Sequence, residues 1–403
     1  MDRITADIVI AGGGVAGLTA AAAFGTAGFD VVIVDPTAPV TDAAAEGADL
    51  RTTAFLQPAQ AFLDRAGLWD RLAPSATALQ IMRIVDVSGA EDKSHTAADF
   101  DAADISDLPF GWNLPNWLLR REMVARLAEL PNVDFRPSVG FKSMLSREAE
   151  NLVQLTDGTQ VRCKLLIGAD GRASAVRQAA EIGVTTTRYG QKALTFAVTH
   201  DAPHDNVSTE IHRSGGPFTL VPLPDHDGKP CSSVVWMEEG ANAKALAALP
   251  AQEFETAATE RSAGIYGPLK LVSPRNLWPI ISQLAESMSG PRTALVAEAA
   301  HVMPPIGAQG LNMSLSDLAC LLDLAQAHRA DPGARHVLDS YHKQRHSDAR
   351  LRVNGVDALN RASMAGSPLL HDLRGLGIKA LHGIAPLRKS LMQLGLGLQS
   401  NDR

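Results

Sequence analysis

The sequence has little cysteine, few aromatic residues and no excess of positive charge. Its three cysteines, Cys163, Cys231 and Cys320, show no CxxC spacing, which argues against a disulfide framework and for a reducing cytoplasm. The formal net charge of −7 offers no basic surface for nucleic acid, whose binding depends on neutralising phosphates. No Gly-x-Ser-x-Gly elbow is present, so hydrolase chemistry has no such nucleophile. The 403 residues suit an enzyme of one large or two interlocked domains.

The chain carries no charge between Asp7 and Asp30, a length that superficially suggests a membrane span. The segment is rich in Gly and Ala, however, and is interrupted at Gly12 to Gly14. An apolar strand over residues 8–10, a glycine turn, an Ala-rich helix and a second strand over residues 31–34 explain it better. The sequence therefore predicts a βαβ unit.

The glycine spacing of this unit is typical of a dinucleotide site. Gly12 permits the tight turn, Gly14 lets the backbone approach a pyrophosphate, and Gly17 allows close packing of the helix. The helix N-terminus attracts the anionic pyrophosphate, and Asp35 stands where a carboxylate accepts from a ribose hydroxyl. This motif alone leaves both FAD and NAD open.

Two later segments supply further motifs. In "LLIGADGRASAVRQAA" a strand runs into Asp170 and Gly171, and Arg177 follows in a helix. In "EAAHVMPPIGAQGLN", residues 298–312, prolines and glycines precede a helix that is expected to begin near Gly310. The positive end of that helix would stabilise a negatively charged partner.

Taken in order, the three motifs resemble those of the class A flavin monooxygenases of the para-hydroxybenzoate hydroxylase fold, and most closely the ubiquinone-biosynthesis hydroxylases. The resemblance implies FAD as cofactor and NAD(P)H as co-substrate. It places Arg51 at the FAD phosphates, Arg120 beside the flavin, and Glu298 where most members carry the aspartate that accepts from a ribityl hydroxyl. The remaining implied contacts are Asp170 and Gly171 near the pyrophosphate, Pro305 and Gly307 in a flavin-positioning loop, and Gly310, Leu311 and Asn312 at the isoalloxazine.

The same resemblance implies an α/β fold. A Rossmann-like FAD-binding domain (1–73, 103–180 and 276–325) would be interleaved with a β-sheet substrate domain (74–102 and 181–275), followed by a C-terminal helical region (326–403). Residues 181–275 are rich in Thr, Val, Pro and Gly, a composition that suits a sheet. The expected strands cover residues 193–198, 209–212, 218–221 and 233–237.

The function implied is hydroxylation, with dioxygen and through a flavin hydroperoxide, of the aromatic ring of a polyprenylated phenol in ubiquinone biosynthesis. Residues 190–240 contain no tyrosine, which favours a greasy phenol over a polar hydroxybenzoate. His212, together with His200, is a weak candidate to face the substrate. Two alternatives stay open: a hydroxylase of a soluble phenolic compound, and a catalytically silent flavin-binding assembly component.

The C-terminal region predicts a basic amphipathic helix, interrupted by Pro386, that could lie on a membrane surface or pack on the body or a subunit interface. The expected location is cytoplasmic, with peripheral attachment to the inner face of the cytoplasmic membrane, contact with other ubiquinone-biosynthesis proteins and a homo-oligomer all left open. His342 and His346 lie one helical turn apart, but no third ligand is evident nearby, so no metal site is predicted. The apolar positions of the predicted C-terminal amphipathic helix are Leu373, Leu376, Ile384, Leu387, Leu391, Leu394 and Leu398.

Overall fold

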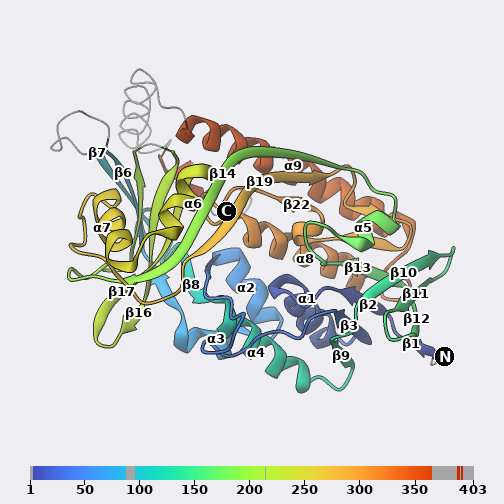
Figure 1. The fold of residues 1–403 in the computed structure, drawn as a ribbon. Helices are drawn as coiled ribbons and strands as arrows, with labels where there is room; N and C mark the ends of the chain where they lie inside the picture. The colour runs from blue at the N-terminus through green and yellow to red at the C-terminus, as the bar shows by residue number, and fades with distance from the viewer. Residues whose placement is uncertain (1–2, 88–95, 214, 365–387, 391, 394–403) are drawn as a thin grey trace.

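The computed structural model describes residues 3–87, 96–213, 215–364, 388–390 and 392–393, and all elements below belong to this part of the chain. Helices cover the faces of two large sheets, which lie side by side (Figure 1). The α-helices are α1 (Val15–Thr26), α2 (Gln57–Arg65), α3 (Trp69–Leu72), α4 (Asn116–Ala128), α5 (Ala175–Ala179), α6 (Gly240–Ala248), α7 (Ala251–Arg261), α8 (Gln309–Ala327) and α9 (Arg335–Met364). Short 3-10 helices cover Ala73–Ser75, Ala102–Asp104 and Ala297–Ala299.

The predicted βαβ unit forms the centre of a six-stranded sheet. Its strands β2 and β3 pair in parallel, and β13 pairs in parallel with the other edge of β2. All four residues of β2 are buried, as expected for a strand covered on both faces. The strand order is β20 (Ser289–Gly290), β21 (Thr293–Leu295), β13 (Leu165–Gly168), β2 (Ile8–Ala11), β3 (Val31–Asp35) and β9 (Val133–Pro137).

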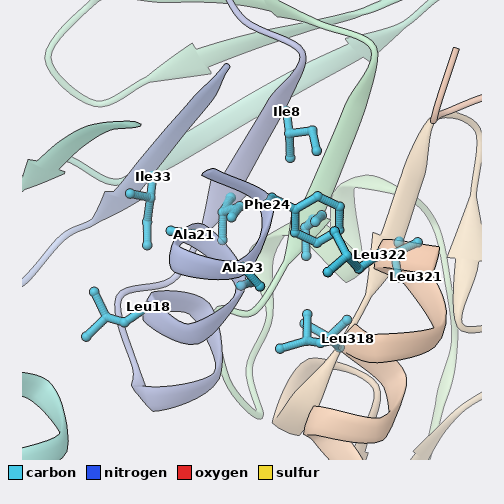
Figure 2. Packing of buried hydrophobic residues seen from close by; sticks show 14 of the residues in the cluster. Ile8, Leu18, Ala21, Ala23, Phe24, Ile33, Leu318, Leu321 and Leu322 are labelled. Atoms are coloured by element: carbon cyan, nitrogen blue, oxygen red, sulfur yellow. The ribbon is translucent and has the colours of Figure 1, made fainter. Parts of the chain in front are cut away.

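Helix α1 packs between this sheet and α8. Its alanines are buried, and their small side chains let the helix lie close to the strands. Figure 2 shows Phe24 of α1 beside Leu322 of α8, with Ile8 and Ile33 contributed by the strands. This packing fixes the start of α8 relative to the glycine turn that precedes α1.

The second large sheet has nine strands and is mainly antiparallel. One face forms a separate core with α6 and α7, around Phe196, Phe218, Trp236 and Phe254. In Figure 1, β14 runs from the side of α5 to these two helices at the left. The strand order is β22 (His301–Val302), β19 (Asn276–Ala285), β14 (Val184–Thr199), β17 (Lys229–Glu239), β16 (Pro217–His226), β15 (Val207–His212), β6 (Ile81–Asp86) and β7 (Thr96–Asp101), and β18 (Lys270–Leu271) pairs with β14.

Two smaller sheets complete the fold. Strands β11 and β12 form a hairpin whose turn is residues 156–159, "TDGT", and β12 leads into β13. The four-stranded sheet contains β1 (Arg3–Thr5), β12 (Gln160–Cys163), β11 (Asn151–Leu155) and β10 (Phe141–Ser146), and the three-stranded sheet contains β4 (Thr52–Leu56), β8 (Gly111–Pro115) and β5 (Thr77–Leu79).

The α/β architecture is confirmed, and each of the four strands predicted between residues 193 and 237 lies within a longer observed strand. Strand β19 lies in the 276–325 segment that the sequence assigned to cofactor binding, yet it pairs with β14 in the nine-stranded sheet. The strand thus belongs to the nine-stranded sheet, and the chain passes from it to β20 of the six-stranded sheet. The proposed domain boundaries remain a prediction.

The C-terminal amphipathic segment lies outside the described residues except for a short piece. There, Arg388 forms an ion pair with Asp104, with 3.0 Å between Nη2 and Oδ2, and Met392 is buried. On α9, His342 accepts from the backbone N–H of Met288 at 3.2 Å, and His346 Nε2 lies 3.1 Å from a backbone carbonyl. Among the described helices, none has both the length and the apolar character needed to span a bilayer.

Candidate functional site

The turn between β2 and α1 uses its three motif glycines differently. Gly12 has a φ of +116°, and a Cβ on it would lie 2.2 Å from the carbonyl oxygen of Ala169. A Cβ on Gly17 would lie 1.9 Å from the carbonyl oxygen of Gly12, so helix and turn touch directly. Gly14, at the N-cap of α1, faces open space, because a Cβ there would meet nothing within 4 Å. The backbone is therefore accessible where a pyrophosphate would approach.

Asp35 ends β3 and is tied to the same turn. Its Oδ2 accepts from the backbone N–H of Gly13 at 2.5 Å, and its Oδ1 accepts from that of Thr37 at 2.8 Å. A carboxylate has about four acceptor positions, so these bonds still leave capacity for a ribose hydroxyl. The ribose contact itself stays a prediction.

The Asp-Gly motif follows β13, directly beside the first turn. Asp170 Oδ2 accepts from the N–H of Val176 at 3.0 Å. Its Oδ1 atom is buried and has no hydrogen-bond partner among the described residues, a costly state that a bound donor would relieve. Gly171 has a φ of +81°, and a Cβ on it would meet nothing within 4 Å. The loop thus offers a free acceptor and open backbone.

Two arginines connect this second motif to the third. The Arg177 guanidinium, in α5, donates to the carbonyl oxygens of Ala299 and Arg172, each at 2.8 Å. Arg172 forms a two-pronged ion pair with the half-exposed Glu298, at 3.1 and 3.2 Å. The predicted ribityl contact of Glu298 stays a prediction. The ion pair with Arg172 was not predicted, because nothing local in the sequence links the two positions.

Arg51 and Arg120 converge on one carboxylate. Arg51 forms two hydrogen bonds with Asp49, at 2.8 and 2.7 Å, and Arg120 of α4 reaches the same carboxylate at 3.3 Å. The Arg51 guanidinium also stacks 4.1 Å from the ring centroid of Trp278 in β19, a favourable cation–π geometry. Burial alone would raise the pKa of Asp49, but the hydrogen bonds and charges of its neighbours lower the pKa below its ordinary value. Sequence reasoning missed both Asp49 and Trp278.

Asn312 fastens the start of α8 to β4. Its Oδ1 accepts from the N–H of Leu56 at 2.8 Å, and its Nδ2 donates to the carbonyl oxygens of Ala54 and Ala308 at 2.7 Å. The side chain is buried, so these bonds replace water. Asn312 therefore positions the helix start through β4, the strand that directly follows Arg51.

The segment of residues 302–308, called the 302–308 loop below, starts at the last residue of β22 and precedes α8. Its last two residues, Gly307 and Ala308, have φ values of +63° and +54°, so both adopt the left-handed conformation. Pro305 and Gly310 are exposed, and a Cβ on Gly310 would meet nothing within 4 Å, whereas Leu311 packs on the main core. Helix α8 begins at Gln309, one residue from the predicted start. The open backbone at the helix start leaves room for a flat ring.

A small apolar cluster lies where the nine-stranded sheet meets the 302–308 loop. Buried Ala193, Met237 and Ile280 pack there with Ile306 of the loop and with Tyr189. Tyr189 also lines a surface cavity of about 290 Å³, together with Arg188, Arg361 and Met364. Tyr189 thus belongs both to the apolar cluster and to the lining of this cavity.

The two candidate histidines lie on opposite faces of this sheet. His200 is stacked on Tyr266 in the core under α6 and α7, 4.8 Å between ring centroids, and this burial lowers its pKa. His212 bonds Glu210 through Nε2 at 2.7 Å, and its buried Nδ1 has no hydrogen-bond partner among the described residues. Ile211 packs in the same core as Tyr266, so the next residue of its strand, His212, points to the opposite face of the sheet.

The residues brought together fit FAD. Gly14, Gly171 and Gly310 leave three open backbone positions, and the buried Asp170 Oδ1 lacks a donor. The N-termini of α1 and α8 can stabilise an anionic pyrophosphate and a reduced ring. The three motifs, far apart in the chain, thus meet in the fold, and their joint role as a dinucleotide site stays a prediction.

Comparisons with known proteins agree with this geometry. A family model described as "FAD binding domain" matches residues 5–355. Ubiquinone hydroxylase UbiL of Rhodospirillum rubrum is 34% identical, over 97% of this chain and 90% of that protein. The 3-demethoxyubiquinol 3-hydroxylase of Escherichia coli is 27% identical, over 97% and 98% of the two chains.

Solved structures share the fold. The p-nitrophenol 4-monooxygenase PnpA of Pseudomonas putida superposes with a TM-score of 0.79 at 20% identity, over 98% of this chain and 99% of that one. At this identity the likeness shows the fold alone. With the family match over most of the chain, the protein belongs to the FAD-binding-domain family of class A aromatic-ring monooxygenases, and FAD is its cofactor.

Proposed function

We propose that this protein hydroxylates the aromatic ring of a polyprenylated phenol in ubiquinone biosynthesis, with NAD(P)H as the reductant of its FAD. The observation that carries the proposal is the apolar cluster that packs on the 302–308 loop. Similarity to the named ubiquinone hydroxylases over nearly the whole chain supports it.

The apolar cluster suits a prenylated ring. Ala193, Met237 and Ile280 are at most 5% exposed and contact the loop through Ile306. A ligand beside such a cluster is bound mainly by burying apolar area, and few polar groups are needed to orient it. Tyr189 belongs both to the cluster and to the lining of the cavity of about 290 Å³, which would be the route for the prenyl tail.

Bound FAD would supply the activation of dioxygen and the transfer of an oxygen atom to the ring. The chain would hold the ring against the 302–308 loop and exclude water through Ile306 and the facing sheet. We assign His212 as the candidate acceptor of the phenol proton. Glu210 holds its Nε2 at 2.7 Å and leaves Nδ1 as the free position.

The finer contacts of the site belong to the same proposal. Gly12, Gly14, Gly17, Asp170 and Gly171 would hold the pyrophosphate, and Asp35 and Glu298 the ribose and ribityl hydroxyls. Arg51 and Arg120 would lie on the phosphate and flavin sides, with Pro305, Gly307, Gly310, Leu311 and Asn312 around the isoalloxazine. We further propose peripheral attachment to an inner membrane surface, because a polyprenyl substrate resides there; contact with other ubiquinone-biosynthesis proteins and self-association belong to the same hypothesis.

One observation favours the alternative of a soluble phenolic substrate. Arg188 and Arg361 line the cavity beside Tyr189, and arginines suit an anionic substituent such as a carboxylate. Arg361, however, already pairs with Asp357 at 2.9 Å. The polyprenylphenol is therefore the better supported substrate.

The test uses Gly14→Asp in a source strain whose only copy of the gene carries the change. The Cβ position of Gly14 is open, so the fold tolerates a side chain there, while the new carboxylate repels the pyrophosphate. We expect an under-hydroxylated polyprenylphenol to accumulate, identified by mass spectrometry of the quinone intermediates.

The matched control is Gly355→Asp, because Gly355 is an exposed residue of α9 whose Cβ position is also open. It should leave the quinone profile unchanged. If the Gly14→Asp protein is present without flavin and the ubiquinone profile is still normal, the proposed substrate is wrong. The soluble phenol or the silent assembly component would then remain.

A further inference from the structure

A chain of ion pairs on α9 reaches both ends of the 302–308 loop. Arg345 and Arg352 lie two helical turns apart and so point to the same side of α9. Asp348 stands between them and contacts both guanidinium groups, at 3.1 Å each. The three side chains form one continuous charged ladder.

The first end of the ladder is buried behind the start of the loop. Arg345 Nε donates to Asp317 Oδ1 at 2.7 Å, and Asp317 Oδ2 lies 2.6 Å from His301 Nε2. The side chains of Asp317 and His301 are 0% and 1% exposed. Burial alone would lower the pKa of Arg345, but Asp317 raises it above its ordinary value, so the guanidinium stays charged. This end fixes the residue directly before the loop.

The second end reaches the end of the loop through one amide. Arg352 Nη1 donates to Gln309 Oε1 at 2.9 Å, and Gln309 Nε2 donates to the carbonyl oxygen of Gly307 at 2.9 Å. Hydrogen bonds in series polarise one another, so the guanidinium strengthens the amide's bond to the loop backbone. The carbonyl of Gly307 is thereby held toward Gln309.

The part of the loop held this way is strained. Ala308 has a φ of +54°, which is unfavourable for a residue with a Cβ. Such conformations persist where the surroundings fix them. Asn312 supplies one restraint by donating to the carbonyl oxygen of Ala308 at 2.7 Å, and the Arg352–Gln309 pair supplies another on Gly307.

We propose that Arg352 is a positioning residue for the flavin, acting through Gln309 on the backbone of Gly307. This inference rests on the proposed placement of the isoalloxazine at the 302–308 loop and the start of α8. With the Gly307 carbonyl turned to Gln309, the N–H groups at the start of α8 can face the ring and stabilise its reduced, anionic form. Arg352 thus sets the reduction potential of the flavin without contacting it.

The test compares Arg352→Ala, Arg352→Lys and Gln309→Leu in the purified holoenzyme. Arg350→Ala is the matched control, since Arg350 is an exposed arginine on the same helix. The midpoint potential of the FAD is measured against a reference dye. We expect Arg352→Ala to reduce the ratio of the affinities for reduced and oxidised flavin at least tenfold. For a two-electron couple, a tenfold reduction lowers the midpoint potential by about 30 mV.

Three further results are expected for the midpoint potential. Gln309→Leu should shift it as much as Arg352→Ala does, and the variant with both changes should shift it no further. Arg352→Lys should shift it less, because lysine keeps one charged donor. In the apoprotein, hydrogen exchange of the 302–308 amides should rise in Arg352→Ala and stay unchanged in Arg350→Ala. This second measurement decides the matter if a variant does not retain FAD.

A loss of thermal stability in Arg352→Ala with an unchanged potential would show a structural role only and overturn the proposal. A shift in Gln309→Leu that Arg352→Ala does not share would also overturn it. Neither measurement involves the phenol, so failure here is distinct from failure of the proposed substrate.

Discussion

Replacing Gly14 by alanine should separate cofactor binding from folding. Gly14 has a φ of −72°, which any residue adopts, and a Cβ there would meet no atom within 4 Å. The added methyl group therefore has room in the apoprotein. It would, however, occupy the space through which a pyrophosphate must approach the start of α1.

The expected size of the effect follows from the contacts at stake. Two backbone N–H groups that bond a charged phosphate contribute about 1.5 kcal/mol each. Losing both costs about 3 kcal/mol, or roughly 100-fold in the Kd for FAD. The apoprotein loses only the small difference between glycine and alanine at an N-cap, about 0.5–1 kcal/mol.

Two other glycines provide controls. Gly17→Ala places a Cβ 1.9 Å from the Gly12 carbonyl oxygen, so it should destabilise the apoprotein by about 1–3 kcal/mol or more. Gly355→Ala, in open space on α9, should add about 1 kcal/mol of stability and leave FAD binding unchanged. FAD titration by flavin fluorescence and urea unfolding of the apoproteins measure both quantities. A Kd for Gly14→Ala within threefold of the parent would refute the placement of the pyrophosphate.

Three further predictions concern charged and titratable groups. Asp317→Ala leaves the buried Arg345 without its main partner, and urea unfolding should show a loss of about 3–5 kcal/mol. Glu298→Asp shortens the side chain and breaks the half-exposed ion pair with Arg172, so the free energy of unfolding should fall by less than about 1 kcal/mol. The shorter side chain can turn to the ribityl group, and isothermal titration should then show tighter FAD binding. Burial, and then its hydrogen bond to a carboxylate, raise the pKa of Tyr189 to about 12 from an ordinary value of 10.0. The folded state therefore keeps this proton longer, so stability is lost as the pH rises from about 10 to about 12, and Tyr189→Phe should flatten that part of the unfolding profile.

Local sequence patterns predicted much of the framework. Strand β2 and helix α8 begin within one residue of their expected positions, and each strand expected between residues 193 and 237 lies within an observed strand. Gly12 and Gly17 were also predictable, because positive φ and close backbone contact are needs that only glycine meets. Such features depend on a few neighbouring residues, so a single sequence reveals them.

The contacts between distant segments could not be predicted in this way. Trp278 of the nine-stranded sheet stacks on Arg51, which directly precedes β4 of the three-stranded sheet, and Arg172 pairs with Glu298 from a different loop. Each contact depends on how strands and helices pack, and neither side chain carries a local signal of its partner. His200 shows the same limit, because only the observed packing reveals that its face of the sheet is covered by α6 and α7.

Residues 297 and 298 bear on the silent-component hypothesis. Ala297, directly before Glu298, has a φ of +54°, the left-handed backbone that glycine adopts most easily. That conformation costs an alanine about 1–2 kcal/mol, so the surrounding packing maintains it against an opposing preference. The extra methylene of Glu298 extends its carboxylate to Arg172, beside the Asp-Gly motif. A silent component that binds flavin would need the same backbone, so dioxygen-dependent turnover of the holoenzyme is the measurement that separates it from an active enzyme, and we expect that turnover.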